Sequence, residues 1–425
     1  MWIRGLRFAL SSVAAALLAS CGASQPPIGA PGAMLSQPAK LELSGDARTA
    51  WSYEVLYRFG PLQYHGIGPA APLLDVNGTL YGTTAYGGKY RNGTVFRFRG
   101  GKEKVLYSFG AAANDGANPY APLIVVNGTL YGTTEYGGSG ECRYTGGNGC
   151  GTVYSISVTG NEKVLYSFAG NSNDDGASPT APLLELNGTL YGTTIRGGTH
   201  NKGTIYSIST SGSETILHSF AGASNDGAGP SAPLINVSGT LYGTTQLGGG
   251  TGCLLHLGCG TVYEITTSGS EKLVYRFAGG QDDGSDPVAP LLDVDGTLYG
   301  TAYSDGAYDS GTVFSVTTSG TEKVLHSFGT DGDGQNPLGG LIDVRGALYG
   351  TTINGGSRNL GVVYRLAESG SETVLYSFGD VSNDGNWPNG LLNVGNSLYG
   401  TAEQGGYYCT RKNIAGCGTI FKLSP

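Results

Sequence analysis

The sequence predicts an all-β protein that folds as a seven-bladed β-propeller with four strands per blade. Three observations support this prediction: a Leu-Tyr-Gly motif occurs seven times, each repeat contains four short β-type runs, and the two ends of the repeat region resemble two parts of one blade. The tyrosines of the motif are 50 to 60 residues apart, at positions 81, 131, 191, 242, 299, 349 and 399. Four strands per unit at this spacing, repeated seven times, is typical of a propeller.

The second repeat shows the four runs most clearly. They are Ala121–Val126, Gly128–Thr134, Gly151–Ser157 and Glu162–Phe168, and the first two are separated by an Asn-Gly turn. β-Branched and aromatic residues fill the runs, while Gly, Asn, Asp and Ser fill the gaps between them. The fourth run is apolar on both faces, as expected for a blade strand packed between two neighbours. A two-sheet sandwich would alternate apolar and polar residues more cleanly.

The ends of the repeat region predict how the ring closes. The region begins with a lone run of the fourth type at Tyr53–Phe59 and finishes with a run of the third type at Gly418–Leu423. Pairing residues 53–59 with the C-terminal blade would complete that blade and remove two exposed sheet edges. The alternative is an open β-solenoid, which would need no matching ends.

The N-terminal segment predicts export and anchoring. Residues 1–20 read as a lipoprotein signal peptide, because Arg4 and Arg7 precede an apolar stretch that is too short to span a membrane. The stretch ends in Leu-Ala-Ser-Cys, which resembles a bacterial lipobox with Cys21 as the lipidated residue. The alternative is an ordinary signal peptide with a chance cysteine. We interpret residues 21–50 as the lipidated cysteine with a flexible tether and residues 51–425 as the propeller.

This organisation predicts a lipid-anchored protein of the bacterial cell envelope, at the outer membrane or cell surface, that touches the membrane only through its anchor. The formal net charge is −8, and the chain has no basic run. Nucleic-acid binding depends on neutralising phosphates, so we expect no nucleic-acid partner.

Six further cysteines form three local pairs: Cys142 with Cys150, Cys253 with Cys259, and Cys409 with Cys417. Each pair lies in a long loop between the second and third runs of its repeat. In an oxidising envelope this pattern predicts three disulfides that pin long hairpins. A zinc site would require closer cysteine spacing and a second pair or a histidine nearby.

The repeat unit is similar to a known family. The string LYSFAG, followed by NDGASPTAPLLELNGTLYGTT and GTIYSIS, resembles the GloVer (gloeo/verruco) tandem repeat of bacterial surface proteins. The resemblance covers about Tyr53 to Pro425. It implies a surface location with one of the varied anchors of the family, which a lipidated Cys21 would fit, and it implies no established activity or ligand.

In a four-stranded blade, loops alternate between two rims. The turns after the first and third runs are short and uniform, whereas the loops after the second run vary in length and composition. Variable loops on a rigid scaffold are common binding sites. The predicted binding rim carries aromatic and cationic residues of the exposed type: Tyr86, Tyr90, Arg91, Tyr136, Arg143, Tyr144, Tyr407, Tyr408, Arg411 and Lys412. The alternative is that these loops are solvated and only fill space.

The loops after the fourth run lie on the same rim and repeat Asp-Gly-x-x-Pro. The aspartates are Asp115, Asp175, Asp226, Asp283, Asp333 and Asp384, and His65 takes this place in the first repeat. A ring of carboxylates is a weak candidate for binding Ca²⁺ or a polyol, and no other cofactor is expected. The simpler interpretation is that each Asp caps its own turn.

Catalysis is less favoured than binding. The five histidines form no Ser-His-Asp order and no HExxH motif, and His218 and His326, which replace Tyr in the fourth run, are most simply packing residues. The favoured hypothesis is a surface-tethered, non-catalytic module that recognises a polysaccharide or an envelope protein. The alternatives are a structural subunit of an outer-membrane assembly, or a propeller lyase or hydrolase.

Overall fold

The computed structural model describes residues 51–60, 64–142, 147–170, 174–222, 224–250, 252–253, 257–367, 369–409 and 416–425, together with the backbone of a short strand, β1 (Leu41–Glu42). The predicted signal peptide, Cys21 and most of the tether lie outside the described residues. No helix in the described part of the chain is long and apolar enough to cross a membrane.

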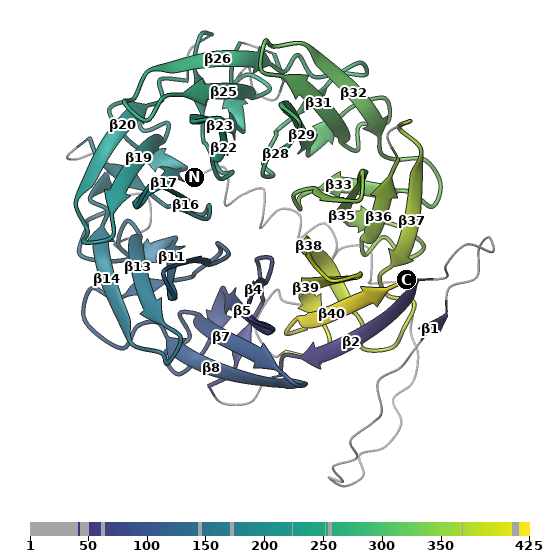
Figure 1. The fold of residues 1–425 in the computed structure, drawn as a ribbon, viewed down its shortest axis with the longest axis horizontal. Helices are drawn as coiled ribbons and strands as arrows, with labels where there is room; N and C mark the ends of the chain where they lie inside the picture. Colours follow the sequence, from purple (N-terminus) through teal and green to yellow (C-terminus); the bar gives the residue numbers. More distant parts are fainter. Residues whose placement is uncertain are drawn as a thin grey trace, which may run out of the picture.

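The described residues form seven antiparallel blades arranged in a ring (Figure 1), which confirms the predicted fold class. Blade 1 consists of β4 (Leu74–Val76), β5 (Thr79–Thr84), β7 (Thr94–Arg99) and β8 (Lys102–Ser108). Blade 2 consists of β10 (Ile124–Val126), β11 (Thr129–Thr134), β13 (Thr152–Ser157) and β14 (Glu162–Ser167). Blade 3 consists of β16 (Leu184–Leu186), β17 (Thr189–Thr194), β19 (Thr204–Ser209) and β20 (Glu214–Ser219).

The remaining blades repeat this order. Blade 4 consists of β22 (Ile235–Val237), β23 (Thr240–Thr245), β25 (Thr261–Ile265) and β26 (Glu271–Arg276). Blade 5 consists of β28 (Leu292–Val294), β29 (Thr297–Ala302), β31 (Thr312–Thr317) and β32 (Glu322–Ser327). Blade 6 consists of β34 (Ile342–Val344), β35 (Ala347–Gly355), β36 (Val362–Leu366) and β37 (Glu372–Ser377). Blade 7 consists of β38 (Gly385–Val394), β39 (Ser397–Gly405), β40 (Thr419–Ser424) and β2 (Ser52–Arg58).

The ring closes as the sequence predicts. β2, from the start of the domain, pairs antiparallel with β40 at its end, with Tyr53 opposite Leu423 and Val55 opposite Phe421. β1 then adds to the edge of β2 through residues 41 and 42. The innermost strand of blade 2, β10, is shorter than the predicted run because Pro122 precedes it and has no N–H to donate to a ladder.

The core is divided into seven clusters, each at a seam between two neighbouring blades. The phenylalanine that follows each fourth strand packs edge-to-face on an aromatic ring of the next blade; Phe168 and Tyr206 have ring centroids 5.0 Å apart. The glycine of the Leu-Tyr-Gly motif makes room for that second ring, since a Cβ on Gly192 would collide with Tyr206. The motif therefore repeats because every seam needs the same close approach.

Candidate functional site

The variable loops and the Asp-Gly segments lie on one rim, which we call the long-loop rim. In most blades they form a two-stranded ladder: β3 (Gly66–Ile67) with β6 (Tyr86–Gly87), β9 (Gly116–Ala117) with β12 (Tyr136–Gly137), β15 (Gly176–Ala177) with β18 (Arg196–Gly197), β21 (Gly227–Ala228) with β24 (Leu247–Gly248), β27 (Gly284–Ser285) with β30 (Ser304–Asp305), and β33 (Gly334–Pro337) with β35. In blade 7, β38 and β39 extend to make the same pairing. These ladders give the variable loops a fixed base.

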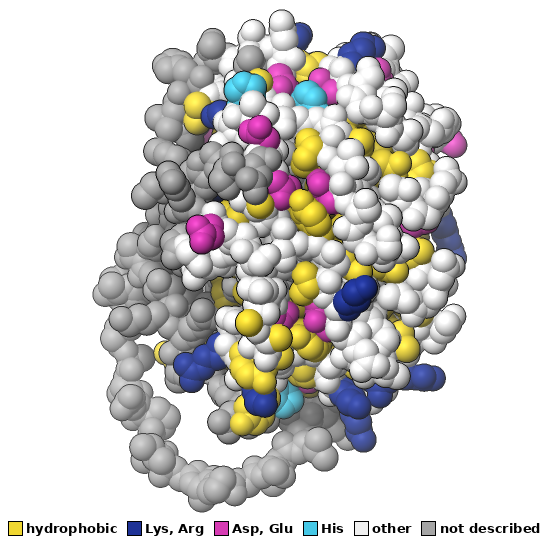
Figure 2. Space-filling model, turned by 90° about the vertical axis from the view of Figure 1, so that its left-hand side faces the viewer, with side chains coloured by type: hydrophobic (Ala, Val, Ile, Leu, Met, Phe, Trp, Pro, Cys, Tyr) yellow, Lys and Arg dark blue, Asp and Glu magenta, His cyan; other side chains and the backbone are white. Residues whose placement is uncertain are grey.

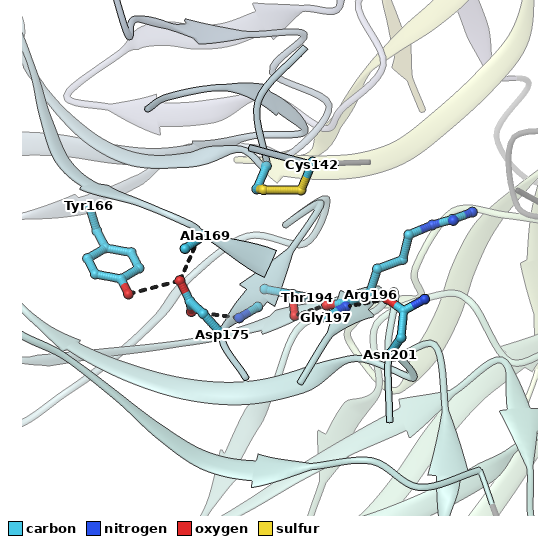
Figure 3. The surroundings of a disulfide bond; sticks show 10 residues. Cys142, Tyr166, Ala169, Asp175, Thr194, Arg196, Gly197 and Asn201 are labelled. Carbon is cyan, nitrogen blue, oxygen red and sulfur yellow. Dashed lines mark hydrogen bonds between the residues drawn. A yellow bond between two sulfur atoms is a disulfide. The ribbon is translucent and has the colours of Figure 1, made fainter. Parts of the chain in front are cut away.

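The repeated aspartates hold this base together. Asp175 is 6% exposed, and its Oδ2 accepts hydrogen bonds from the Ala169 amide at 2.7 Å and the Tyr166 hydroxyl at 3.0 Å (Figure 3). Its Oδ1 accepts from the Gly176 amide at 2.6 Å. The same pattern occurs in the equivalent blades, so each carboxylate caps its own turn, as in the simpler sequence interpretation. The Ca²⁺ hypothesis for these aspartates stays a prediction.

A glutamate from the next blade joins five of the six aspartates. It is the first residue of the fourth strand there, and its pKa is affected by the Asp and by the Tyr or His of the preceding blade. We call these three residues the seam trio. The trios are Tyr107–Asp115–Glu162, Tyr166–Asp175–Glu214, His218–Asp226–Glu271, Tyr275–Asp283–Glu322 and His326–Asp333–Glu372.

Two seams depart from this composition. At the seam between blades 7 and 1, His65 replaces Asp, and its Nδ1 lies 3.2 Å from Glu103 Oε2 and 3.3 Å from the Tyr57 hydroxyl. At the seam between blades 6 and 7, Tyr53 replaces Glu, and its hydroxyl donates to Asp384. Both departures involve the chain segment that closes the ring.

Burial raises the pKa values of the trio glutamates. Desolvation raises the pKa of Glu162, Glu214 and Glu322 to about 7, the neighbouring aspartate contributes in the same direction, and the hydrogen bond from the tyrosine partly offsets both. One oxygen of each of these glutamates is buried without a hydrogen-bond partner among the described residues. Burial at these seams therefore favours the neutral form of the three glutamates.

We expect the protein to become less stable as the pH rises from 5 to 8. The folded-state pKa of Glu162, Glu214 and Glu322 is about 7, above the unfolded value of 4.5, so the folded state binds more protons in this interval and its free energy of unfolding falls with rising pH. The melting temperature, measured by circular dichroism at each pH, should fall across the interval. The triple variant E162Q/E214Q/E322Q should show a flatter profile, and the exposed-site control Glu185→Gln an unchanged one. An equal slope in the triple variant would refute this assignment.

The seam between blades 7 and 1 contains a cleft with a volume of about 1100 Å³. It runs along the length of β2, and its lining combines apolar and polar side chains. The lining includes Leu56, Phe98, Tyr399, Tyr407, His65, Arg58 and Arg99. His65 is held by Glu103, whose side chain is 1% exposed, and can exchange hydrogen bonds with a bound hydroxyl group.

The cleft exists because one turn is short. In blade 2 the turn between β13 and β14 covers the outer strand of blade 1, so that a Cβ on Gly160 would lie 2.5 Å from the Leu106 carbonyl oxygen. In blade 1 the turn between β7 and β8 contains only Gly100 and Gly101, and a Cβ added to either would meet nothing within 4 Å. The outer strand of blade 7 therefore remains uncovered at this seam.

A second cleft, of about 1130 Å³, lies on the other side of blade 1, at its seam with blade 2. Its lining is rich in amides and includes Asn92, Asn114, Asn118, Ser139, Glu141 and Asn148. Blade 1 is thus flanked by an aromatic cleft and a polar cleft.

The predicted rim residues differ in exposure. Tyr90, Tyr407 and Tyr408 are 39%, 52% and 82% exposed, and Arg91 is also exposed. Tyr86 is half-buried, with its hydroxyl 2.5 Å from that of Tyr120. The residues Arg143, Tyr144, Arg411 and Lys412 lie outside the described residues. Two further exposed tyrosines, Tyr64 at 53% and Tyr308 at 54%, lie on this rim and are not among the predicted residues.

The expectation of exposure is wrong for Tyr136, which is 5% exposed. It pairs with Ala117 in the ladder of β9 and β12, and its hydroxyl donates to Glu135. The ring is therefore enclosed at the seam.

The three predicted disulfides are present: Cys142–Cys150, Cys253–Cys259 and Cys409–Cys417. They do more than pin loop tips. Each belongs to a seam cluster, and Cys150 and Cys417 are fully buried. Gly170, whose carbonyl oxygen accepts a hydrogen bond from the Asp175 amide, lies against the sulfurs of the Cys142–Cys150 disulfide. The disulfides therefore form part of the buried core at the long-loop end of three seams.

Figure 2 shows one flank of the molecule, on which uncharged surface predominates and acidic side chains occur in close pairs.

The sequence prediction missed two features of the site: the glutamates of the seam trios and the cleft beside blade 1. A signal for each was present, in the glutamate that begins nearly every fourth run and in the short Gly100-Gly101 turn.

The sequence matches a known repeat family along most of its length. The Gloeobacter/Verrucomicrobia repeat model matches residues 46–142, 139–345 and 255–425. No curated protein matches the chain in sequence.

Similar solved structures include a gluconolactonase from Xanthomonas campestris, at 14% identity and a TM-score of 0.37, with 64% of this chain and 78% of that chain covered. The PQQ-bound aldose sugar dehydrogenase of Streptomyces coelicolor has 12% identity and a TM-score of 0.42, with 88% and 98% covered. A puromycin hydrolase has 10% identity and a TM-score of 0.46, with 86% and 58% covered.

Proposed function

The chain belongs to the Gloeobacter/Verrucomicrobia repeat family, and we propose that it is a non-catalytic recognition module that binds a polysaccharide through the long-loop rim beside blade 1. The observation that carries the proposal is the gathering of exposed tyrosines at the seam between blades 7 and 1. Tyr64 directly precedes His65, which lines the aromatic cleft together with Tyr407. Tyr64, Tyr407 and Tyr408 are 53%, 52% and 82% exposed.

This chemistry suits a glycan. An exposed tyrosine offers a flat apolar face on which a sugar ring can stack, together with a hydroxyl that can form a hydrogen bond. In the aromatic cleft, His65, Arg58 and Arg99 supply polar partners for sugar hydroxyl groups. The amide-rich cleft on the other side of blade 1 would extend the same surface to further sugar units.

The proposed location is the bacterial cell envelope. The family resemblance, the predicted signal peptide and the lipobox at Cys21 support a lipid-anchored protein at the outer membrane or cell surface, with residues 22–50 as the tether. The three disulfides are consistent with an oxidising compartment.

The test is a binding screen against bacterial envelope polysaccharides, using a chain that lacks residues 1–20 and carries Cys21→Ser so that it stays unlipidated. We expect saturable binding to at least one polysaccharide, and we expect Y407A/Y408A to bind it at least about tenfold more weakly, the usual effect of removing central aromatic contacts. Tyr308→Ala is the matched control, because this tyrosine is equally exposed but lies in the long loop of blade 5. It should bind like the unsubstituted chain.

Two results would reject the proposal. One is the absence of binding across the screen, and the other is equal weakening by the Tyr308 control. Cellular crosslinking to one dominant protein, together with no glycan binding, would favour the alternative role as a subunit of an envelope assembly.

A further inference from the structure

We propose that His218, Asp226 and Glu271 form a binding site for a divalent transition-metal ion at the seam between blades 3 and 4. His218 lies in β20, Asp226 lies in the loop before β21, and Glu271 begins β26 of the next blade. One ligand atom from each residue can be chosen so that all three lie within 4.8 Å of one another. An ion held here would link two blades.

The donor set favours a transition metal. An imidazole nitrogen and two carboxylate oxygens are ligands that Zn²⁺ commonly takes, whereas Ca²⁺ takes oxygen ligands only. Two carboxylates would balance the charge of a divalent ion. Three protein ligands would leave room for water to complete the coordination.

The glutamate of this trio lacks the partner that its counterparts have. In the trios with tyrosine, the hydroxyl hydrogen-bonds the glutamate as well as the aspartate, as Tyr166 does with Glu214. No such hydrogen bond reaches Glu271 from within the described residues. Its Oε1, like that of the other trio glutamates, is buried without a partner there. A bound cation would satisfy this carboxylate.

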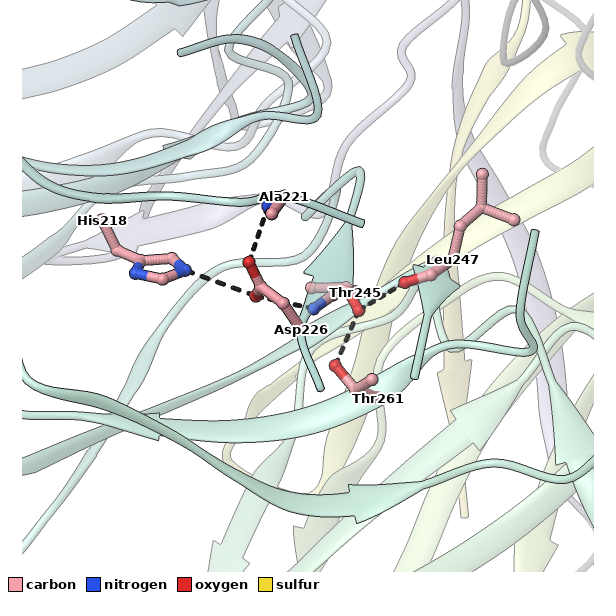
Figure 4. A network of polar contacts seen from close by, with 7 residues as sticks. His218, Ala221, Asp226, Thr245, Leu247 and Thr261 are labelled. Carbon is pink, nitrogen blue, oxygen red and sulfur yellow. Dashed lines mark hydrogen bonds and ion pairs between the residues drawn. The ribbon is translucent and has the colours of Figure 1, made fainter. Parts of the chain in front are cut away.

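The aspartate is already oriented as a ligand would be. Asp226 accepts hydrogen bonds from the amides of Ala221 at 2.6 Å and Gly227 at 2.7 Å, and its Oδ1 lies 3.3 Å from His218 Nε2 (Figure 4). Outer-sphere amide donors of this kind fix ligating carboxylates in metal sites. The side chains of His218 and Asp226 are 22% and 14% exposed, so an ion can reach them from solvent.

The chain provides its own controls. His326, Asp333 and Glu372 repeat the residue types at the seam between blades 5 and 6, with His326 Nε2 3.1 Å from Asp333 Oδ2. Within the described part of the chain, however, only the trio of His218 gathers its ligand atoms to within 4.8 Å. Three of the other trios carry tyrosine in place of the histidine, so the His218→Tyr variant has a composition that the fold accepts.

The experiment is isothermal titration calorimetry of Zn²⁺ into the tag-free full chain after treatment with EDTA. We expect one saturable site per chain that is abolished in His218→Tyr and weakened at least about tenfold in the isosteric Glu271→Gln. His326→Tyr should keep the site. Circular dichroism melting of each variant, with and without Zn²⁺, provides a second readout, because binding to the folded state raises the melting temperature.

The proposal is overturned if the full chain shows no saturable Zn²⁺ binding, or if His218→Tyr and Glu271→Gln bind as tightly as the unsubstituted chain. Loss of the site in His326→Tyr with retention in His218→Tyr would also overturn it.

Discussion

Deleting residues 1–59 is expected to abolish cooperative folding, whereas deleting residues 1–50 is expected to leave the propeller intact. The difference between the two chains is β2, which forms the outer strand of blade 7 and pairs with β40. Tyr53, Val55 and Phe59 are 1%, 7% and 0% exposed. Burying a large apolar side chain stabilises a protein by about 1.5–3 kcal/mol, so losing three of them and a ladder removes a large share of the usual 5–15 kcal/mol.

The loss affects two seams. At the seam between blades 6 and 7, Tyr53 stacks on Tyr376 with ring centroids 3.6 Å apart and its hydroxyl donates to Asp384. At the seam between blades 7 and 1, Phe59 packs on Phe96. Without β2, the edge of β40 would expose unpaired backbone groups and the apolar side chains that β2 covers, which favours aggregation.

Circular dichroism melting and size-exclusion chromatography compare the two truncated chains. We expect the chain that starts at Trp51 to be monomeric with a single sharp transition, and the chain that starts at Gly60 to aggregate or melt without cooperativity. A monomeric shorter chain with an unchanged transition would show that the ring does not depend on this closure.

The fold could be predicted from sequence because its contacts repeat. Phe168, Tyr206 and Gly192 meet at one seam, and residues of the same types recur about 50 residues later at the next, so a local pattern reports a tertiary contact. The closure was predictable for the same reason, since each end of the repeat region carries a recognisable strand of an incomplete blade.

The candidate site was less predictable because it depends on where the repeats differ. Tyr86 and Tyr136 hold equivalent positions, yet Tyr86 is half-buried and Tyr136 is buried, and the sequence does not show how much the neighbouring loops cover. The aromatic cleft results from a turn that is too short to reach its neighbour, and that distance is a property of the assembled ring. The glutamates of the trios repeat plainly, but their partners come from another blade.

Replacing Asp175 with alanine is expected to lower the free energy of unfolding by about 3–5 kcal/mol. The substitution removes the carboxylate that accepts from the Ala169 and Gly176 amides in a buried turn, and it leaves the Tyr166 hydroxyl with Glu214 in place of two carboxylates. Each buried donor without a partner costs about 1–3 kcal/mol. Removing the negative charge beside Glu214 offsets part of this loss, because that charge raises the pKa of Glu214 and disfavours its ionised form.

Urea denaturation followed by tryptophan fluorescence and circular dichroism measures the change. Asp293→Ala is the matched control, since Asp293 also caps a turn, accepting from the Gly296 amide at 3.0 Å, but is exposed on the opposite rim. Its effect should be about 0.5 kcal/mol, as for most surface substitutions. Asp175→Asn should fall between the two, because an amide keeps one acceptor oxygen and turns an N–H₂ toward one of the donors. Equal effects of Asp175→Ala and Asp293→Ala would mean that the repeated aspartates contribute little to the seams, and their recurrence in six blades would then require a binding role.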